Sequence, residues 1–242
     1  MKRFGLVGYP LSHSFSEPYH TAKYKELGIE ATYRNFPLSS LQDLPLLIHT
    51  EKLDGFNVTI PYKEKIIPYL HAIDPMAQSV GAVNCVRIIN EQLWGHNTDI
   101  IGFERSLSQF APDAHRAIVF GTGGASKAIC HVLHSKQISF IKVSRNEILD
   151  GITYADLSKD LVESSDLLIN TSPIGTYPHV DDFLPINYSW IHQRHFAYDL
   201  VYNPAVSKFL YFCQQEGAQI KNGLEMLQIQ ADESIKLFMN ES

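Results

Sequence analysis

Residues 117–126 read AIVFGTGGAS, and this stretch decides the fold of the second half of the chain. A β-rich run leads into three glycines, and a helix is expected over residues 125–135. Glycines let the backbone turn tightly and approach a ligand, while the start of a helix offers unpaired N–H groups to an anion. Because Ser126 stands where a third spaced glycine is usual, an ordinary strand-to-helix turn is the alternative for this segment alone. The favoured interpretation is a pyrophosphate site.

The rest of the second half fits a doubly wound, nucleotide-binding sheet. Further strands are expected at residues 140–144, 166–170 and 195–200 and near Gln219, and a helix at residues 205–216. Alternating strands and helices favour an α/β arrangement of this kind. The last segment, residues 224–239, has apolar residues at helical spacing and predicts a final helix.

The first half also alternates strands with helices, which predicts a second α/β region. Strands are expected at residues 4–7, 31–36 and 56–60, and a hairpin at residues 82–89 and 92–96. Helices are expected at residues 16–27, with Ser16 as the N-cap, at residues 41–49, and from Pro61 to about residue 70.

Composition and charge exclude several classes of function. The 242 residues are 45% hydrophobic, enough for a substantial core, and 20 basic against 26 acidic residues leave no excess to neutralise nucleic acid. The chain shows neither a secretory signal nor a membrane span, so we expect a cytoplasmic protein without nucleic-acid or membrane partners. Three separated cysteines predict reduced, mostly buried thiols.

The end of the strand after the glycines points to one cofactor over another. NAD sites usually place a carboxylate there to bind the ribose hydroxyls, whereas this strand ends in Ser144 and Arg145. A guanidinium can bind a 2′-phosphate with two charge-assisted hydrogen bonds. Arg145 therefore favours NADP, although a solvated surface arginine would be the ordinary explanation for this residue alone.

Four polar motifs in the first half are candidates for binding and catalysis. They are residues 8–16 (GYPLSHSFS), 57–63 (NVTIPYK), 81–84 (GAVN) and 97–99 (NTD). Each alone has an ordinary explanation as a helix cap, a turn or a solvated lysine. Their combination in one chain favours a functional interpretation.

These motifs, with residues 121–125, 198–204 (YDLVYNP) and 222–230 (NGLEMLQIQ), resemble the shikimate dehydrogenase family in order and spacing over nearly the whole chain. The resemblance implies two domains: an α/β substrate domain, residues 1–100 completed by residues 222–242, and a Rossmann-like NADP-binding domain, residues 101–221. It implies an NADP-dependent oxidoreductase that interconverts 3-dehydroshikimate and shikimate on the route to aromatic amino acids. A monomer or homodimer is expected.

The resemblance also assigns roles to single residues. Lys63 and Asp99 would be catalytic. The substrate-binding residues would be Ser14, Ser16, Thr59, Asn84, Tyr202 and Gln230. The cofactor-binding residues would be Gly121, Thr122, Gly123, Gly124, Ala125, Ser144, Arg145, Leu200 and Gly223. No metal is expected.

Lysine and aspartate suit the reduction of a ketone on chemical grounds. Hydride addition leaves negative charge on oxygen, so the site needs a proton donor and a group to orient it. In the first turn of its expected helix, Lys63 would have its pKa lowered by the helix dipole and raised by Asp99. Whether Lys63 donates the proton or acts as an electrostatic clamp stays open.

Three other functions are compatible with parts of the sequence. A relative that also uses quinate would share the fold, and a non-catalytic nucleotide-binding regulator would have lost Lys63 or Asp99, both of which are present. A metal hydrolase is suggested by the histidine pairs His131 with His134 and His192 with His195. Without an H-E-x-x-H motif, surface histidines are the better interpretation.

Overall fold

The computed structural model describes residues 1–11 and 14–240, which form two compact units. Unit 1 comprises Met1–Ile101 and Gln230–Ser242, and unit 2 comprises Gly102–Ile229. Both boundaries fall inside helices, α4 (Asp99–Phe110) and α8 (Leu224–Met239). Each unit has its own six-stranded sheet, which confirms the predicted α/β class.

The sheet of unit 1 has the strand order β2-β1-β3-β5-β6-β4. Its strands are β1 (Lys2–Gly8), β2 (Ala31–Pro37), β3 (Gly55–Val58), β4 (Ala72–Ile73), β5 (Cys85–Ile89) and β6 (Gln92–His96). The first three strands run parallel, and β5 and β6 form the predicted antiparallel hairpin. Its turn holds Asn90 and Glu91 at positive φ, which suits a tight hairpin turn.

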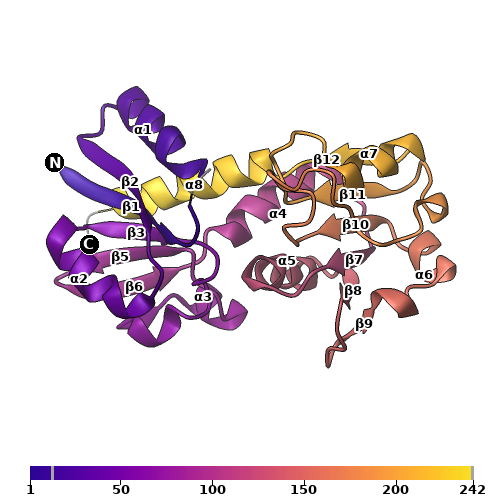
Figure 1. Ribbon diagram of the computed structural model, residues 1–242, viewed down its shortest axis with the longest axis horizontal. Helices are drawn as coiled ribbons and strands as arrows, with labels where there is room; N and C mark the ends of the chain where they lie inside the picture. Colours follow the sequence, from indigo (N-terminus) through magenta and orange to yellow (C-terminus); the bar gives the residue numbers. More distant parts are fainter. Residues whose placement is uncertain (12–13, 241–242) are drawn as a thin grey trace. The chain divides into compact units, whose positions relative to one another are not determined.

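Alternation along β1 explains how helices cover both faces of this sheet. Val7 packs in one apolar cluster with Leu44 of α2 (Leu44–Glu51). Phe4 lies in the other, with Tyr24 of α1 (Ser16–Leu27) and residues of α8. Successive strand residues point to opposite faces, so one strand supplies both clusters. Figure 1 shows α8, drawn in yellow, running alongside the strands of unit 1.

The sheet of unit 2 is parallel throughout, with the order β12-β11-β10-β7-β8-β9. Its strands are β7 (Arg116–Phe120), β8 (Ser139–Ser144), β9 (Gly151–Thr153), β10 (Leu167–Asn170), β11 (Phe196–Asp199) and β12 (Gln219–Lys221). Numbered within the unit, this is the order 3-2-1-4-5-6 of dinucleotide-binding folds. The strand order reverses between β7 and β10, and such sheets bind ligands outside the carboxyl ends of the strands at that point.

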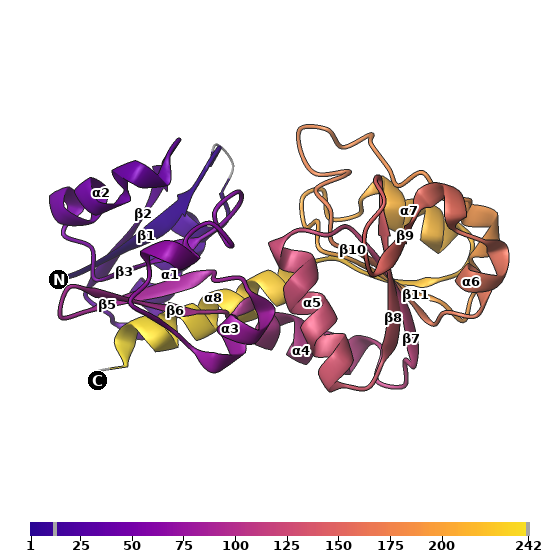
Figure 2. The ribbon, with the colours of Figure 1, turned by 90° about the horizontal axis from the view of Figure 1, so that it is seen from below.

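Helices cover both faces of this second sheet as well. Figure 2 shows α5 (Gly124–Ser135) on one face and α6 (Lys159–Glu163) and α7 (Lys208–Gln215) on the other. Phe120 of β7 packs with Phe209 of α7 in a large apolar cluster. The doubly wound arrangement predicted for this half is confirmed.

The helix predicted from Pro61 to about residue 70 is wrong. The segment forms turns followed by a short 3-10 helix at Ile67–Tyr69. The carbonyl of Lys63 accepts a hydrogen bond from Val83 N at 2.7 Å, so it is not part of a helical ladder. Pro68 has no N–H to donate to Glu64, which removes another helical bond. The helix-dipole argument for Lys63 therefore does not apply.

Smaller predictions also need correction. The N-cap of α1 is Phe15 rather than Ser16, and Ser16 is its first helical residue. The helix predicted at residues 41–49 begins as a 3-10 turn, Leu41–Asp43, and the one predicted from residue 205 begins at Lys208. The sequence gives no bounds for four short elements, α3 (Pro75–Val80), α6, β4 and β9. These elements have six residues or fewer, too short for hydrophobic periodicity to show.

All three cysteines are free thiols, and Cys85 and Cys213 are buried. Within residues 1–11 and 14–240, no helix combines the length and apolar character that crossing a membrane requires.

Candidate active site

Lys63 and Asp99 form an ion pair inside unit 1. The lysine Nζ lies 2.6 Å from Asp99 Oδ2, although the two residues are 36 positions apart. Lys63 follows β3 in the irregular segment, and Asp99 is the first residue of α4. The side chains are only 17% and 7% exposed, so water screens this pair less than it would a surface pair.

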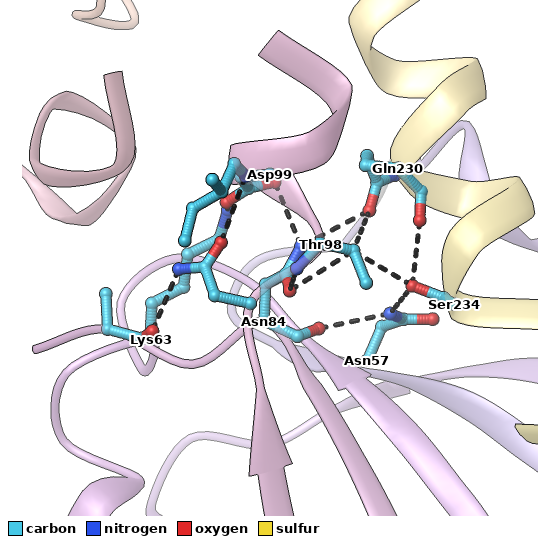
Figure 3. A network of polar contacts seen from close by, with 10 residues as sticks. Asn57, Lys63, Asn84, Thr98, Asp99, Gln230 and Ser234 are labelled. Atoms are coloured by element: carbon cyan, nitrogen blue, oxygen red, sulfur yellow. Dashed lines mark hydrogen bonds and ion pairs between the residues drawn. The ribbon is translucent and has the colours of Figure 1, made fainter. Parts of the chain in front are cut away.

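Asn84 holds the other oxygen of the carboxylate. Its Nδ2 donates to Asp99 Oδ1 at 2.9 Å and to the Thr98 hydroxyl at the same distance. Its Oδ1 accepts from Thr98 N at 2.7 Å, which orients the amide. Asp99 is thus fixed from two sides, with a cation on one oxygen and an amide on the other (Figure 3).

Gln230 of α8 joins the same group. Its Oε1 lies 3.3 Å from both Asn84 Nδ2 and Thr98 Oγ1. Four of the residues that the sequence analysis assigned to the site therefore lie together: Lys63, Asn84, Asp99 and Gln230.

Three further residues of this network, Asn57, Thr98 and Ser234, have no role in the predicted site. Asn57 of β3 and Ser234 of α8 are joined by a hydrogen bond of 2.8 Å. Asn57 belongs to a quoted motif but was given no role, and Ser234 lies outside every motif. A serine four residues after Gln230 on one helix was the available signal, because such residues share a helix face.

The predicted carboxylate-binding serines lie before and at the start of α1. Ser14 Oγ accepts from Ser16 N at 3.1 Å, and both residues are partly exposed. Ser12 and His13 of the same motif lie outside the described residues. Thr59 lies next to Gly8, since Thr59 N donates to Val7 O at 2.9 Å. A Cβ on Gly8 would come within 2.4 Å of the Thr59 methyl group, so only glycine allows this approach.

The remaining predicted residues belong to unit 2. Tyr202 follows β11 and is partly exposed, and its predicted contact with substrate stays a prediction. Gly223 lies between β12 and α8, where its N–H donates to Val201 O at 3.2 Å. A Cβ on Gly223 would stand 2.1 Å from the carbonyl oxygen of Leu200. Glycine at this position therefore lets the two predicted cofactor residues meet.

The glycine turn has the features that a phosphate group needs. Gly121 has a φ of 114°, a conformation that favours glycine, and Gly123 is the N-cap of α5 without any side-chain cap. A Cβ on Gly123 would meet nothing within 4 Å, so space is open above the helix start. Unpaired N–H groups beside open space fit the pyrophosphate of NADP, with Thr122, Gly124 and Ala125 completing the turn.

Ser144 and Arg145 follow at the end of β8, the strand next to β7. The Ser144 hydroxyl accepts from Asn146 N at 3.3 Å, and Arg145 is exposed. An exposed guanidinium at this strand end suits the 2′-phosphate of the same cofactor.

A buried carboxylate supports the loop after β11. Asp199 has no exposed surface, and its Oδ1 accepts from Val201 N and Asn170 Nδ2, both at 2.9 Å. Ser207 donates to the other oxygen. Burial raises the pKa of Asp199 to about 7, while these hydrogen bonds oppose the rise. Asp199 thereby fixes the backbone that leads to Tyr202.

The histidine pairs do not form a metal centre. In the part of the chain that the structure describes, no three His, Cys, Asp or Glu side chains are placed to hold an ion. The prediction of surface histidines is wrong for His195, which is fully buried. Its Nδ1 accepts from His192 N at 3.0 Å, and its Nε2 lies 2.9 Å from Val162 O. Both ring nitrogens of His195 thus make hydrogen bonds within the protein.

Comparison with known proteins gives consistent results over the whole chain. Residues 6–86 match the family model described as shikimate dehydrogenase substrate binding domain. The NADP(+) shikimate dehydrogenase of Staphylococcus epidermidis (strain ATCC 35984) is 36% identical over 250 residues, covering 98% of this chain and 92% of the relative.

Solved structures show the same fold. A shikimate 5-dehydrogenase from Thermus thermophilus, in complex with NADP(H) and shikimate, is 27% identical with a TM-score of 0.88, over 99% of this chain and 94% of the other. A quinate dehydrogenase from Corynebacterium glutamicum, in complex with NAD, has a TM-score of 0.87 at 24% identity, over 98% and 93% of the two chains. This second likeness shows a shared fold only. On the full-length identity to its curated relatives, the chain belongs to the shikimate dehydrogenase family.

Proposed function

We propose that this protein reduces 3-dehydroshikimate to shikimate with NADPH, on the route to aromatic amino acids. The observation that carries the proposal is the partly buried ion pair of Lys63 and Asp99, held by Asn84, in a chain of this family. NADPH, when bound at the glycine turn and Arg145, supplies the hydride.

The side chains of unit 1 would manage the charge that forms on the ketone oxygen. The Lys63 ammonium, oriented by Asp99, would face that oxygen, and Asn84 and Gln230 would bind neighbouring ring oxygens. Ser14, Ser16, Thr59 and Tyr202 would hold the carboxylate and the remaining hydroxyl. A positive group placed in advance where negative charge develops stabilises the transition state. Lys63 either donates the proton itself or clamps the oxygen while a hydroxyl or water does so.

The proposal is tested by incubating the protein with shikimate, with quinate or without substrate, in each case with NADP+ or with NAD+. Formation of the reduced cofactor is followed by its near-ultraviolet absorbance. We expect shikimate with NADP+ to give the highest kcat/KM. Comparable kcat/KM for quinate would replace the proposal with dual specificity. Absence of turnover with bound NADP+ would favour a nucleotide-binding regulator. The predicted cytoplasmic location and the choice between monomer and homodimer stay predictions.

A further inference from the structure

Asn57 is a buried amide whose two ends are used by different partners. It is 5% exposed, and its Oδ1 accepts from the phenol of Tyr33 at 2.9 Å. Its Nδ2 donates to Ser234 Oγ at 2.8 Å and to Asn84 O at 3.1 Å. Burial holds the pKa of Tyr33 well above its usual range, so the phenol keeps its proton and remains a donor. The orientation of the Asn57 amide is thereby determined.

Ser234 is fully buried and uses all its hydrogen-bonding capacity. Its hydroxyl donates to Gln230 O at 2.9 Å and accepts from Asn57. Thr98 Oγ1 lies 3.1 Å away on its remaining side. A serine hydroxyl has one proton and two lone pairs. Because the proton of Ser234 is used by Gln230 O, we assign Thr98 as the donor to Ser234.

The direction of the hydrogen bond between Thr98 and Ser234 determines whether the Thr98 hydroxyl donates to Asn84 or accepts from it. The single proton of Thr98 could also go to Asn84 Oδ1 at 3.2 Å or to Gln230 Oε1 at 3.3 Å. With its proton on Ser234, the Thr98 oxygen accepts from Asn84 Nδ2 instead. The second Asn84 hydrogen then points at Asp99 Oδ1. A continuous chain of hydrogen bonds thus joins Asn57 through Ser234, Thr98 and Asn84 to the carboxylate beside Lys63 (Figure 3). Asn57 and Thr98 both donate to Ser234 in this chain, and Tyr33 donates to its Asn57 end.

We propose that Asn57 and Ser234 are positioning residues, which keep the Thr98 hydroxyl as an acceptor for Asn84 and so hold the Asn84 amide and Gln230 in place around Asp99. The inference rests on the proposed function, since it concerns how that site is held for the ketone. Neither side chain is placed to bind substrate, because every polar atom of both is already used inside the protein. Without Ser234, the Thr98 proton would turn to Asn84 Oδ1 or Gln230 Oε1.

A purely structural role is the rival explanation, because buried serines often bond the carbonyl four residues earlier in a helix. Ser165 offers a matched control in unit 2. It is 4% exposed, and its Oγ donates to Leu161 O at 2.8 Å, the same i to i−4 bond that Ser234 makes. Ser165→Ala removes an equivalent hydroxyl from the unit that does not contain Asp99.

The test compares Ser234→Ala, Tyr33→Phe, their double variant and Ser165→Ala in the full-length protein. We expect Ser234→Ala to lower kcat for shikimate about 10-fold, with an unchanged KM for NADP+, because it misplaces groups around the reacting atoms only. Tyr33→Phe should lower kcat less, and the double variant less than the product of the two, because both act through one chain of bonds. Ser165→Ala should keep kcat within about twofold.

Unchanged kcat in Ser234→Ala, with a melting temperature lowered as in Ser165→Ala, would overturn the positioning role and leave the proposed function standing. If Ser234→Ala does not fold, Tyr33→Phe decides, since it removes one hydroxyl and keeps the ring. Wild-type kcat in Tyr33→Phe would then overturn the role. An inactive wild-type protein would remove the proposed function and this inference together.

Discussion

At the scale of single residues, Lys63 and Asp99 should act as one unit. They share a 2.6 Å ion pair, and both would act on one oxygen. General acid or base groups usually contribute about 10² to 10⁴ in rate, so Lys63→Ala and Asp99→Asn should each lower kcat in that range. The double variant should lose much less than the product. Steady-state kinetics measures this, and circular dichroism controls for folding.

Two other results would change the assignment. If Lys63→Ala raises KM for shikimate and leaves kcat unchanged, the lysine binds substrate only. Strictly multiplicative losses would mean separate roles for the two residues.

Arg145 should determine the preference between cofactors. Its exposed guanidinium at the end of β8 can contact the 2′-phosphate, which NADH lacks. Arg145→Ala should lower kcat/KM for NADPH by the equivalent of about 1.5 to 3 kcal/mol and leave kcat/KM for NADH nearly unchanged. The kcat/KM values with each cofactor provide the measurement, and equal weakening of both would refute this role.

At the scale of elements, two glycines of one turn should respond differently to the same substitution. Gly121 has a positive φ, and a Cβ there would come within 2.7 Å of Thr171 Oγ1. Gly121→Ala should therefore destabilise the fold by about 2 kcal/mol or more. Gly123 has open space, so Gly123→Ala should cost at most about 1 kcal/mol but weaken NADP binding.

Urea unfolding and equilibrium titration with NADP+ separate the two effects. If Gly123→Ala left the affinity for NADP+ unchanged, the open space above α5 would not be the phosphate site.

The strength of local signals explains which elements the sequence predicts. In unit 2, a strand, three glycines and an amphipathic helix follow one another within 20 residues or so, and β7 and α5 form as predicted. The segment after Pro61 carries a helix-like start but no helix. Its decisive contact, Val83 N to Lys63 O, joins residues distant along the chain. Helix propensity predicts local structure poorly where a backbone carbonyl accepts a hydrogen bond from a residue distant in the sequence.

At the scale of the whole molecule, hydrogen bonds between residues distant in the sequence also limit how much of the site can be predicted. The family motifs bring Lys63, Asn84, Asp99 and Gln230 into view, because each stands in a recognisable stretch. The bond from Asn57 to Ser234 joins residues 177 positions apart, and Ser234 carries no local mark. Buried polar groups must find partners, but the sequence alone does not say which ones.

The buried carboxyl of Asp199 predicts how stability varies with pH. Burial raises its pKa from 3.8 to about 7 in the folded protein. Between pH about 4 and about 7, the folded state therefore keeps a proton that the unfolded chain releases. The free energy of unfolding should fall as pH rises through this window, by up to about 1.4 kcal/mol per pH unit, and the contribution should level off on either side.

Asp199→Asn cannot ionise and should remove this contribution. Relative to wild type, the variant should gain stability as pH rises from about 4 and stop gaining near pH 7, whatever its stability at low pH. Urea unfolding across this range measures the difference. In a Trp94→Phe background the fluorescence of Trp190, which packs against the apolar cluster of unit 2, reports the unit that contains Asp199. Asp113→Asn, at an exposed position, controls for loss of a negative charge. A difference between variant and wild type that stays constant with pH would show that Asp199 does not hold its proton in the folded protein.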